Sequence, residues 1–508
     1  MKTSSPFFRS AFGLVISALF SISGCGGADM STSTGGGYGG GSAGGGSYGA
    51  TPGGAQDFRY VRKLIAQGQV PSESLFFVEG LLSEHDLPIA GKACKELLCV
   101  RLATSVALDV PQIANEGETV SEPVRRTYVQ VGFGSGLSED TFRRAPLDLA
   151  LVVDVSGSMG TSKMNAAKHA LRELVKKLSA NDRVSLIRFN DRASVLLAPT
   201  AGDRTQTLIQ AIDTLHSGGG TNIEAGIRLG REQIKSVRAD GGGDDVVRSR
   251  RLMLFTDAMP NVGATGPMSF VSIVEAMAGE DKIGLTAFGV GIDFNAKLID
   301  TISNLRGGNY FYLADEKAIR EIFDKDFDFL VTPLAYDLEL KLHIPPGFKM
   351  VAAYGIKDWQ VGSADHVLKV PTIFLSRNKG AIVVALERDE NASASSSMLD
   401  VFGANLKYEL VDGSIVKDTL SSEVPARVFD SGEQAYHGQD GVRKAVALVK
   451  LAVSMRRACK AHSAGQSAAA RSFLQQAIND FQAEATALND GALEPEMDLA
   501  AKLLENMK

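Results

Sequence analysis

Five oxygen-bearing side chains in three separate segments are of the types that bind a hard metal cation. Asp154, Ser156 and Ser158 lie within one run, Asp-Val-Ser-Gly-Ser. Thr221 follows three glycines, and Asp257 follows a strand-like run. Together they offer two carboxylates and three hydroxyls with no histidine or cysteine nearby. An all-oxygen set of this kind suits a cation such as Mg²⁺ or Ca²⁺, so the residues predict a divalent cation site.

The elements that must position these residues alternate between strands and helices over residues 145–332. Leu147–Val153 is almost continuously apolar, as a strand buried on both faces of a parallel sheet should be. Arg251–Thr256 is expected to be another buried strand. The alternation predicts an α/β domain with a doubly wound, mostly parallel sheet. Ligands bind such sheets at the carboxyl ends of the strands, which is where Asp154 and Asp257 are expected to lie.

The Asp-x-Ser-x-Ser run, the Gly-Gly-Gly-Thr-Asn segment and the later aspartate together resemble the von Willebrand factor type A family. This resemblance implies a Rossmann-like domain that carries one cation in a metal-ion-dependent adhesion site. It implies that three hydroxyls bind the metal, those of Ser156, Ser158 and Thr221. It also implies that Asp154 and Asp257 act directly or through water. Mg²⁺ is the expected ion, with Ca²⁺ and Mn²⁺ as alternatives.

Hydroxyl ligands are uncharged, so a cation that they hold stays electrophilic. The open position of such a metal should attract a carboxylate from a protein partner, which is a binding mechanism rather than a turnover mechanism. Each segment alone is common in turns, loops and helix caps, and only the combination in this order is specific. Ala258 stands where the family usually has glycine, which predicts an altered loop but no lost ligand.

Two other functions compete with a cation-dependent binding scaffold. One is an accessory role in assembling an envelope complex, because relatives of this domain act as adaptors beside ATPases. The other is a metal-assisted hydrolase with Ser156 or Ser158 as nucleophile. A serine nucleophile needs a neighbouring base, and no histidine falls in a recognised triad motif: His85, His169, His216, His343, His366, His437 and His462. With no phosphate loop and no zinc spacing either, we expect no enzymatic activity and no small-molecule cofactor.

Length and composition limit the remaining choices. A chain of 508 residues is too long for one core, so several folded units are expected. The hydrophobic fraction of 44% and the charged fraction of 22% are near the globular average. A net charge of -6 and the lack of a long basic run argue against a nucleic-acid partner.

The first 25 residues resemble a bacterial lipoprotein signal. Basic residues flank the start of an apolar stretch over residues 11–22, which is too short to span a bilayer. The run Ile-Ser-Gly-Cys ending at Cys25 resembles a lipobox, whose cysteine is acylated; a plain signal peptide with an incidental cysteine is the alternative. Gly26 follows, instead of the aspartate that retains many lipoproteins in the inner membrane. We therefore expect a lipid anchor at Cys25 in the bacterial cell envelope, with the outer membrane favoured.

The remaining segments are expected to flank the α/β domain. Residues 26–56 are rich in glycine and serine and predict a disordered tether. Residues 57–144 predict a small α+β module, whose beginning resembles that of bacterial calcium-activated chloride channel homologues. That resemblance implies no conduction, because no downstream apolar run reaches membrane-spanning length. Residues 333–430 predict a β-rich domain, and residues 431–508 an alanine-rich helical region.

Cysteines and valines in these flanks give two further expectations. Cys94 and Cys99 could close a short disulfide in an oxidising compartment, a pairing that the sequence leaves open. Cys459 lies on a predicted amphipathic helix, where a buried thiol is expected. Four valines on the same helix are expected to form internal core rather than a docking surface: Val442, Val446, Val449 and Val453.

Overall fold

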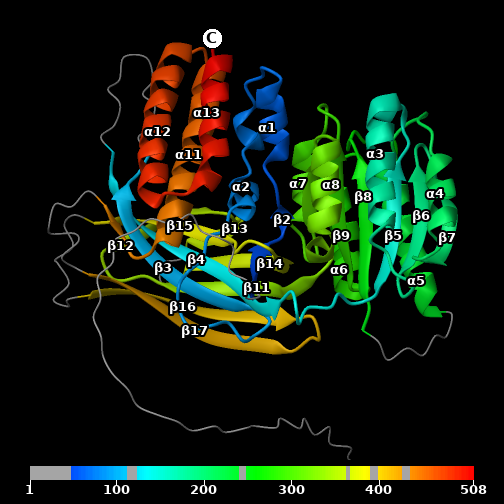
Figure 1. Cartoon of the computed structure of the whole chain (residues 1–508), viewed down its shortest axis with the longest axis horizontal. Helices are drawn as coiled ribbons and strands as arrows, with labels where there is room; N and C mark the ends of the chain where they lie inside the picture. The colour runs from blue at the N-terminus through cyan, green and yellow to red at the C-terminus, as the bar shows by residue number, and fades with distance from the viewer. Residues whose placement is uncertain (1–46, 111–122, 240–246, 362–365, 390–398, 426–434) are drawn as a thin grey trace, which may run out of the picture. The chain divides into compact units, whose positions relative to one another are not determined.

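The computed structural model describes residues 47–110, 123–239, 247–361, 366–389, 399–425 and 435–508. Two β-sheets and several groups of helices make up this part of the chain (Figure 1). None of the helices described in it is long and apolar enough to cross a bilayer. The signal sequence, Cys25 and most of the predicted tether lie outside the described residues, so the lipid anchor stays a prediction.

The smaller sheet is the mostly parallel one. Its strands are β2 (Gly54–Ala55), β5 (Leu147–Asp154), β6 (Arg183–Phe189), β7 (Ala193–Ala201), β8 (Ser249–Thr256), β9 (Ile283–Val290) and β10 (Asn309–Leu313). Their order is β2-β10-β9-β8-β5-β6-β7, and every pair is parallel except β6 with β7. All residues of β5 are buried, as expected for a central strand.

Helices cover both faces of this sheet (Figure 1). They are α3 (Gly160–Val175), α4 (Thr205–Asp213), α5 (Ile223–Ala239), α6 (Pro267–Glu280), α7 (Ala296–Ser303) and α8 (Glu316–Lys325), followed by α9 (Phe327–Leu330). One buried cluster joins α3, α4 and α8 to Leu149 and Leu151 of β5. A second joins α5, α6 and α7 to Ala150 and Val152 of the same strand. Alternate residues of β5 thus face opposite helical layers, and the prediction of a doubly wound α/β domain is confirmed.

The larger sheet is antiparallel and has eleven strands. They are β1 (Ser47–Pro52), β3 (Cys99–Leu108), β4 (Arg125–Ser138), β11 (Pro333–His343), β12 (Phe348–Tyr354), β13 (Asp358–Val361), β14 (His366–Ser376), β15 (Ala381–Arg388), β16 (Leu399–Leu410), β17 (Ile415–Pro425) and β18 (Tyr436–His437). The main path runs β12-β15-β4-β1-β14-β11-β16-β17, with β13 paired to β14 and β3 paired to β4 and β18.

This sheet corrects the expectation of separate units at residues 57–144 and 333–430. β4 comes before the α/β domain, yet it pairs with β15, which comes after it, from Gly132↔Ala381 to Arg126↔Glu387. One hydrophobic core includes residues from both regions. Local periodicity shows that a segment is a strand, but it does not name a partner far away in the chain. The two regions form one sheet.

The end of the predicted tether is also corrected. β1 lies between β4 and β14 in the larger sheet, and β2 pairs with β10 of the smaller sheet. Gly53 alone separates the two strands, and its N–H donates to the Thr372 carbonyl oxygen. Gly54 has φ +87°, and a Cβ there would collide with the side chain of Asn304. The prediction of a disordered tether is therefore wrong for residues 47–55. This segment contributes one strand to each sheet.

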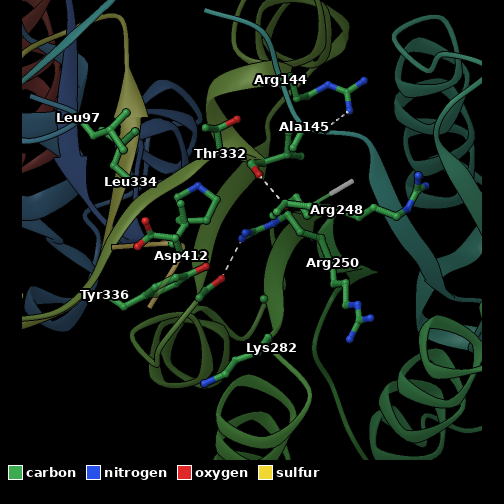
Figure 2. A pocket seen from close by; sticks show the side chains of 18 of the residues that line it. Leu97, Arg144, Ala145, Arg248, Arg250, Lys282, Thr332, Leu334, Tyr336 and Asp412 are labelled. Carbon is green, nitrogen blue, oxygen red and sulfur yellow. Dashed lines mark hydrogen bonds between the residues drawn. The ribbon is translucent and has the colours of Figure 1, made fainter. Parts of the chain in front are cut away.

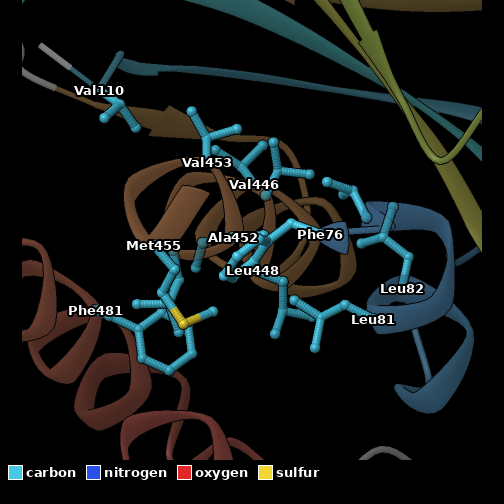
Figure 3. Packing of buried hydrophobic residues seen from close by; sticks show 14 of the residues in the cluster. Phe76, Leu81, Leu82, Val110, Val446, Leu448, Ala452, Val453, Met455 and Phe481 are labelled. Carbon is cyan, nitrogen blue, oxygen red and sulfur yellow. The ribbon is translucent and has the colours of Figure 1, made fainter. Parts of the chain in front are cut away.

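Helices from both ends of the chain form a layer that we call the helical layer. They are α1 (Arg59–Ala66), η1 (Glu73–Leu75), α2 (Val78–Glu84), α11 (Asp440–Ser463), α12 (Ser467–Leu488), η3 (Gly491–Leu493) and α13 (Glu494–Asn506). Figure 3 shows α11 packed between the N-terminal helices and α12, with Leu448 and Met455 in the shared core. The four valines of α11 named above are all buried, as predicted. We call the larger sheet and the helical layer together the composite unit.

A buried ionic cluster joins the two ends of the chain within the helical layer. Glu496 of α13 is 2% exposed. Its Oε1 accepts a hydrogen bond from Arg62 at 2.7 Å and lies 3.0 Å from Nε2 of His85. Burial alone would raise the pKa of Glu496, but the hydrogen bond with His85 and the charge of Arg62 outweigh burial, and the pKa lies below its usual value.

The structure settles whether Cys94 and Cys99 pair, which the sequence left open. Cys94 and Cys99 form a disulfide. Cys459 is free and buried in α11, and burial raises the pKa of its thiol to about 12. This thiol is therefore protonated at neutral pH and acts as a small apolar core residue.

Candidate metal centre

Two neighbouring parallel strands bring the predicted carboxylates together. β5 ends at Asp154, and β8 ends at Thr256, directly before Asp257. The two strands pair up to Val153↔Phe255, so both chains leave the sheet at the same edge. The Thr256 hydroxyl donates to Oδ2 of Asp154 at 2.6 Å. This bond fixes the Asp154 carboxylate at the carboxyl edge, as the sequence predicted.

The turn after β5 arranges the two serines. The Ser156 N–H donates to Oδ1 of Asp154 at 2.8 Å, which holds the turn against the carboxylate. The Ser156 and Ser158 hydroxyl oxygens lie 2.9 Å apart. The Ser158 hydroxyl donates to Oδ1 of Asp257 at 3.2 Å. Four of the five predicted residues are therefore connected by hydrogen bonds.

Backbone hydrogen bonds bring the fifth residue, Thr221, to the same edge. The Gly218 N–H donates to the Val155 carbonyl at 2.7 Å, and the Gly157 N–H donates to the Gly219 carbonyl at 2.9 Å. These bonds join the glycine-rich loop to the serine turn. The Thr221 N–H in turn donates to Oδ1 of Asn261 at 2.8 Å. The loop therefore places Thr221 beside the serine turn.

Burial gives this site its electrostatic character. Asp154, Ser156 and Asp257 are fully buried and Thr221 is 1% exposed, whereas Ser158 is exposed at the rim. Burial raises the pKa of Asp154 to about 6, although hydrogen bonds from Ser156 and Thr256 lower it. The nearby charge of Asp257 raises it further. Two desolvated carboxylates at one edge favour a cation there.

The site also includes a positively charged side chain, that of Lys163, which the sequence analysis missed. Nζ of Lys163, in the first turns of α3, donates to Oδ2 of Asp257 at 2.9 Å. Its spacing after Ser158 places it on the helix that follows the serine turn. Sequence spacing alone does not show that its side chain turns back to the strand edge. Asn261 and Thr256 were missed for the same reason, because their roles depend on contacts between segments.

The oxygen donors fit a small octahedral cation. Bonds of about 2.1 Å at right angles place adjacent ligand oxygens about 3.0 Å apart. The Ser156–Ser158 and Ser158–Asp257 separations, 2.9 and 3.2 Å, are close to this value. The described residues contain no group of three or more His, Cys, Asp or Glu side chains that could hold a metal. A metal at this edge would therefore depend on the hydroxyls.

Residues 148–325 match the family model for the von Willebrand factor type A (VWA) domain. This match covers the whole candidate metal centre and most of the smaller sheet. The segment is a VWA domain. The family is the one that the Asp-x-Ser-x-Ser run and the later segments resembled, and a bacterial protein is among the relatives.

Known proteins match parts of the chain. The uncharacterized protein YfbK of Escherichia coli is 26% identical over 203 residues, which are 40% of this chain and 34% of YfbK. The magnesium-chelatase 67 kDa subunit of Chlorobaculum tepidum is 31% identical over 186 residues, 33% of this chain and 28% of the subunit. The chain thus spans about a third of these relatives' length. The solved structure of a von Willebrand factor type A protein from Catenulispora acidiphila is 14% identical in sequence, with a TM-score of 0.49. The matched region covers 79% of this chain and 89% of the Catenulispora chain.

Ala258, the difference from the usual VWA pattern, lies directly beside the metal centre. Its φ is +56°, in the left-handed region that favours glycine. Its N–H donates to the Thr256 hydroxyl at 2.8 Å, and its methyl group is fully buried. The glycine that the family usually has would adopt this backbone without strain. The chain retains the turn with alanine in its place.

A cavity of about 540 Å³ lies at the opposite edge of the VWA sheet (Figure 2). It is lined by Arg248, directly before β8, by Arg250 in β8, by Tyr336 of β11 and by Asp412 in the turn between β16 and β17. Arg248 donates to Oδ1 of Asp148 at 2.8 Å, and Arg250 donates to a backbone carbonyl. Because these guanidinium groups already have acceptors, the metal centre is the better candidate for function.

Proposed function

We propose that this protein is a non-enzymatic scaffold that binds a protein partner through one divalent cation in its VWA domain. The observation that carries the proposal is the set of short oxygen contacts among Ser156, Ser158 and Asp257 at the carboxyl edge of the sheet. The match of residues 148–325 to the VWA family supports a role in protein interaction.

The ligand chemistry favours binding over turnover. Ser158 is exposed, so a partner can approach the site from the rim. The hydroxyl ligands themselves add no negative charge to a bound cation, and a partner carboxylate would complete its coordination. The serine hydroxyls hydrogen-bond to each other and to Asp257, an arrangement suited to holding a cation.

Mg²⁺ is the cation that we propose. Ca²⁺ binds oxygen at 2.3–2.6 Å, so adjacent ligands in a regular octahedron would be about 3.4 Å apart. The Ser156–Ser158 separation of 2.9 Å is nearer to the value of about 3.0 Å expected for Mg²⁺, and the Ser158–Asp257 separation of 3.2 Å lies between the two values. Mn²⁺ prefers similar oxygen ligands and serves as a probe of the same site.

A lipid at Cys25 would anchor this scaffold to the bacterial cell envelope, with the outer membrane favoured. The support for this part of the proposal is the lipobox-like run before Cys25 and the glycine-rich segment after it. Labelling of cells with a fatty-acid analogue tests it: we expect incorporation into the wild-type protein and none into Cys25→Ser. Equal labelling of both proteins would contradict the anchor and leave the metal centre unaffected.

An accessory role in the assembly of an envelope complex is the second candidate. The observation that favours it is the match to a protein named as one subunit of magnesium-chelatase. A scaffold that binds one partner and an assembly factor that joins two differ in the number of partners bound at once. Chemical crosslinking in cells, with and without a chelator, separates these possibilities.

Calorimetric titration with Mg²⁺, Ca²⁺ and Mn²⁺ tests the metal centre directly. The fragment 45–508 is the suitable protein, because it keeps β1 and β2. We expect saturable binding at one site that is lost in Asp154→Ala and kept in the control Asp213→Ala, whose carboxylate is exposed on α4. Absence of binding in the folded wild-type fragment would refute the proposed function.

Carboxylate binding is tested with acetate as the probe. We expect millimolar acetate to perturb the electron paramagnetic resonance spectrum of Mn²⁺ bound to the fragment. A spectrum that acetate does not change would indicate that the coordination sphere is closed to partner carboxylates.

A further inference from the structure

Lys163 is held at the metal centre by three separate features of the fold. Its Nζ lies 2.9 Å from Oδ2 of Asp257 and 3.9 Å from Oδ2 of Asp293. Its aliphatic carbons lie against Gly291, where a Cβ would be 2.7 Å from Cδ of the lysine. Gly291 has φ +86°, a conformation that side chains rarely adopt. The position of this lysine is therefore built into the loop after β9.

The charge balance at Asp257 explains why a lysine is placed there. Asp257 is fully buried, and a buried carboxylate without a counter-charge is strongly unfavourable. The Lys163 side chain is 17% exposed, so its ammonium is also largely removed from water. The Coulomb attraction between two such groups is much stronger than in bulk solvent. Lys163 therefore supplies the positive charge that Asp257 needs when no metal is bound.

A divalent cation would interact with the same carboxylate. The Ser158 hydroxyl contacts Oδ1 of Asp257, and Lys163 contacts Oδ2, so one carboxylate faces both the serine turn and the lysine. A cation beside the serines would compete for Asp257 and would repel the nearby ammonium. Asp293, whose side chain is 78% exposed, offers the lysine a second carboxylate at the rim.

We propose that Lys163 is a positioning residue that sets the metal affinity of this centre by competing with the divalent cation for Asp257. In the cation-free protein, the ammonium keeps the buried carboxylate neutralised and the turn assembled. When the cation binds, Lys163 releases Oδ2 of Asp257 and moves toward Asp293. The inference rests on the proposed function, because it requires that the centre binds a cation.

Lys163→Met tests this competition, since methionine keeps the aliphatic bulk and removes the charge. Lys168→Met is the matched control on the same helix, because Lys168 donates to the Asp213 carbonyl away from the site. By calorimetry with fragment 45–508, we expect Lys163→Met to bind Mg²⁺ roughly tenfold more tightly than the wild type, equivalent to about 1.4 kcal/mol. We also expect a lower Tm without metal and a larger rise in Tm when Mg²⁺ is added.

The outcomes separate the inference from the proposed function. A lysine with only a structural role would weaken binding or leave it unchanged when removed, so tighter binding supports competition. Equal or weaker Mg²⁺ binding by Lys163→Met would overturn the inference and leave the metal centre intact. Absence of binding in both proteins would refute the proposed function itself.

Amine labelling of the wild-type protein tests the same inference without a variant. Acylation of each lysine by an N-hydroxysuccinimide ester is measured by mass spectrometry, with and without Mg²⁺. We expect labelling of Lys163 to increase several-fold with Mg²⁺, while labelling of Lys168 stays constant. Unchanged or reduced labelling of Lys163 in a protein that binds Mg²⁺ would overturn the inference.

Discussion

The VWA domain is built almost entirely from one continuous stretch of the chain, whereas the composite unit is built from the regions on both sides of that stretch. Six of the seven strands of the VWA sheet come from one continuous stretch, and only β2 is added from outside. The composite unit takes its strands and helices from both sides of that stretch. Continuous construction lets local sequence patterns define a fold and its site. Construction from two distant regions depends on pairings that only the folded molecule shows.

The same difference separates the candidate functional site, which lies in the VWA domain, from the composite unit, which contains none of the predicted metal ligands. The predicted metal ligands and Lys163 all belong to the continuous VWA stretch. β2 joins this stretch as a strand of the VWA sheet. The composite unit contacts the stretch at several points, among them Tyr60, whose hydroxyl donates to the Ile292 carbonyl at 2.9 Å, and Thr372, whose hydroxyl accepts a hydrogen bond from the Gly307 N–H at 2.6 Å. Tyr60 contacts the loop that holds Lys163, whereas the core of the helical layer contains none of the predicted metal ligands. We therefore expect that substitutions in this core alter stability far more than they alter metal affinity.

Leu448→Ala in α11 should have the largest effect on stability. Leu448 is fully buried in the core shared by both ends of the chain, so its truncation should lower the free energy of unfolding by about 3 kcal/mol. Denaturant unfolding measures this loss, with the exposed Gln475→Ala as control. Mg²⁺ affinity should stay within about twofold of the wild type. A tenfold change in affinity would show that the two regions are energetically coupled.

Gly54→Ala should have the next largest effect, because it alters the strand that joins the two regions. The substitution adds left-handed backbone strain and a clash with Asn304, and should cost about 2 kcal/mol. Gly68→Ala is the matched control, since Gly68 has φ +82° but open space around its Cβ position. Thermal unfolding of both variants isolates the contact from the strain. Equal losses of stability would mean that the packing against Asn304 contributes nothing.

Glu496→Gln should have a smaller and pH-dependent effect. The folded-state pKa of Glu496 is lowered, so the ionised form stabilises the fold above the ordinary pKa of 4.5, and this contribution is lost as pH falls below that value. We expect the variant to be about 1.5 kcal/mol less stable at pH 7 and the difference to shrink toward pH 3. Denaturant unfolding of the wild type and the variant between pH 7 and pH 3 measures how the free energy of unfolding of each protein depends on pH. A difference that does not vary with pH would contradict the ionic role of Glu496.

The sequence predicted the VWA domain well because its signals are local. Leu147–Val153 was expected to be a buried strand, and the structure places β5 at Leu147–Asp154. The edge at which Asp154 and Asp257 meet follows from parallel strands ending together. Thr221 came from the resemblance to the VWA family, which is carried in part by the three glycines before it. None of these inferences needed knowledge of a distant contact.

The remaining features depended on distant contacts. β1, Ser-Tyr-Gly-Ala-Thr-Pro, has little apolar content, and its position between β4 and β14 supplies the pairing that its own composition does not indicate. Lys163 has an ordinary helical spacing, and its role depends on Gly291, far away in the chain. Composition and periodicity describe a segment, whereas these roles belong to pairs of segments.

Ala258→Gly should have the smallest effect and tests how much strain the VWA domain holds beside its candidate metal centre. Glycine would relieve about 1–2 kcal/mol of left-handed strain. It would also remove a buried methyl group worth about 0.8 kcal/mol and add about 0.5–1 kcal/mol of chain entropy to the unfolded state. These terms nearly cancel, so the free energy of unfolding should change by less than about 0.5 kcal/mol, as measured by denaturant unfolding.

A gain of more than about 1 kcal/mol in Ala258→Gly would contradict this balance. It would mean that the backbone next to Asp257 is held in a strained state by the surrounding core, and such strain is found where a site must change conformation. Calorimetry with Mg²⁺ on the same variant then decides what the strain does. Unchanged affinity would assign it to packing alone, whereas altered affinity would assign it to the competition between Lys163 and the cation for Asp257.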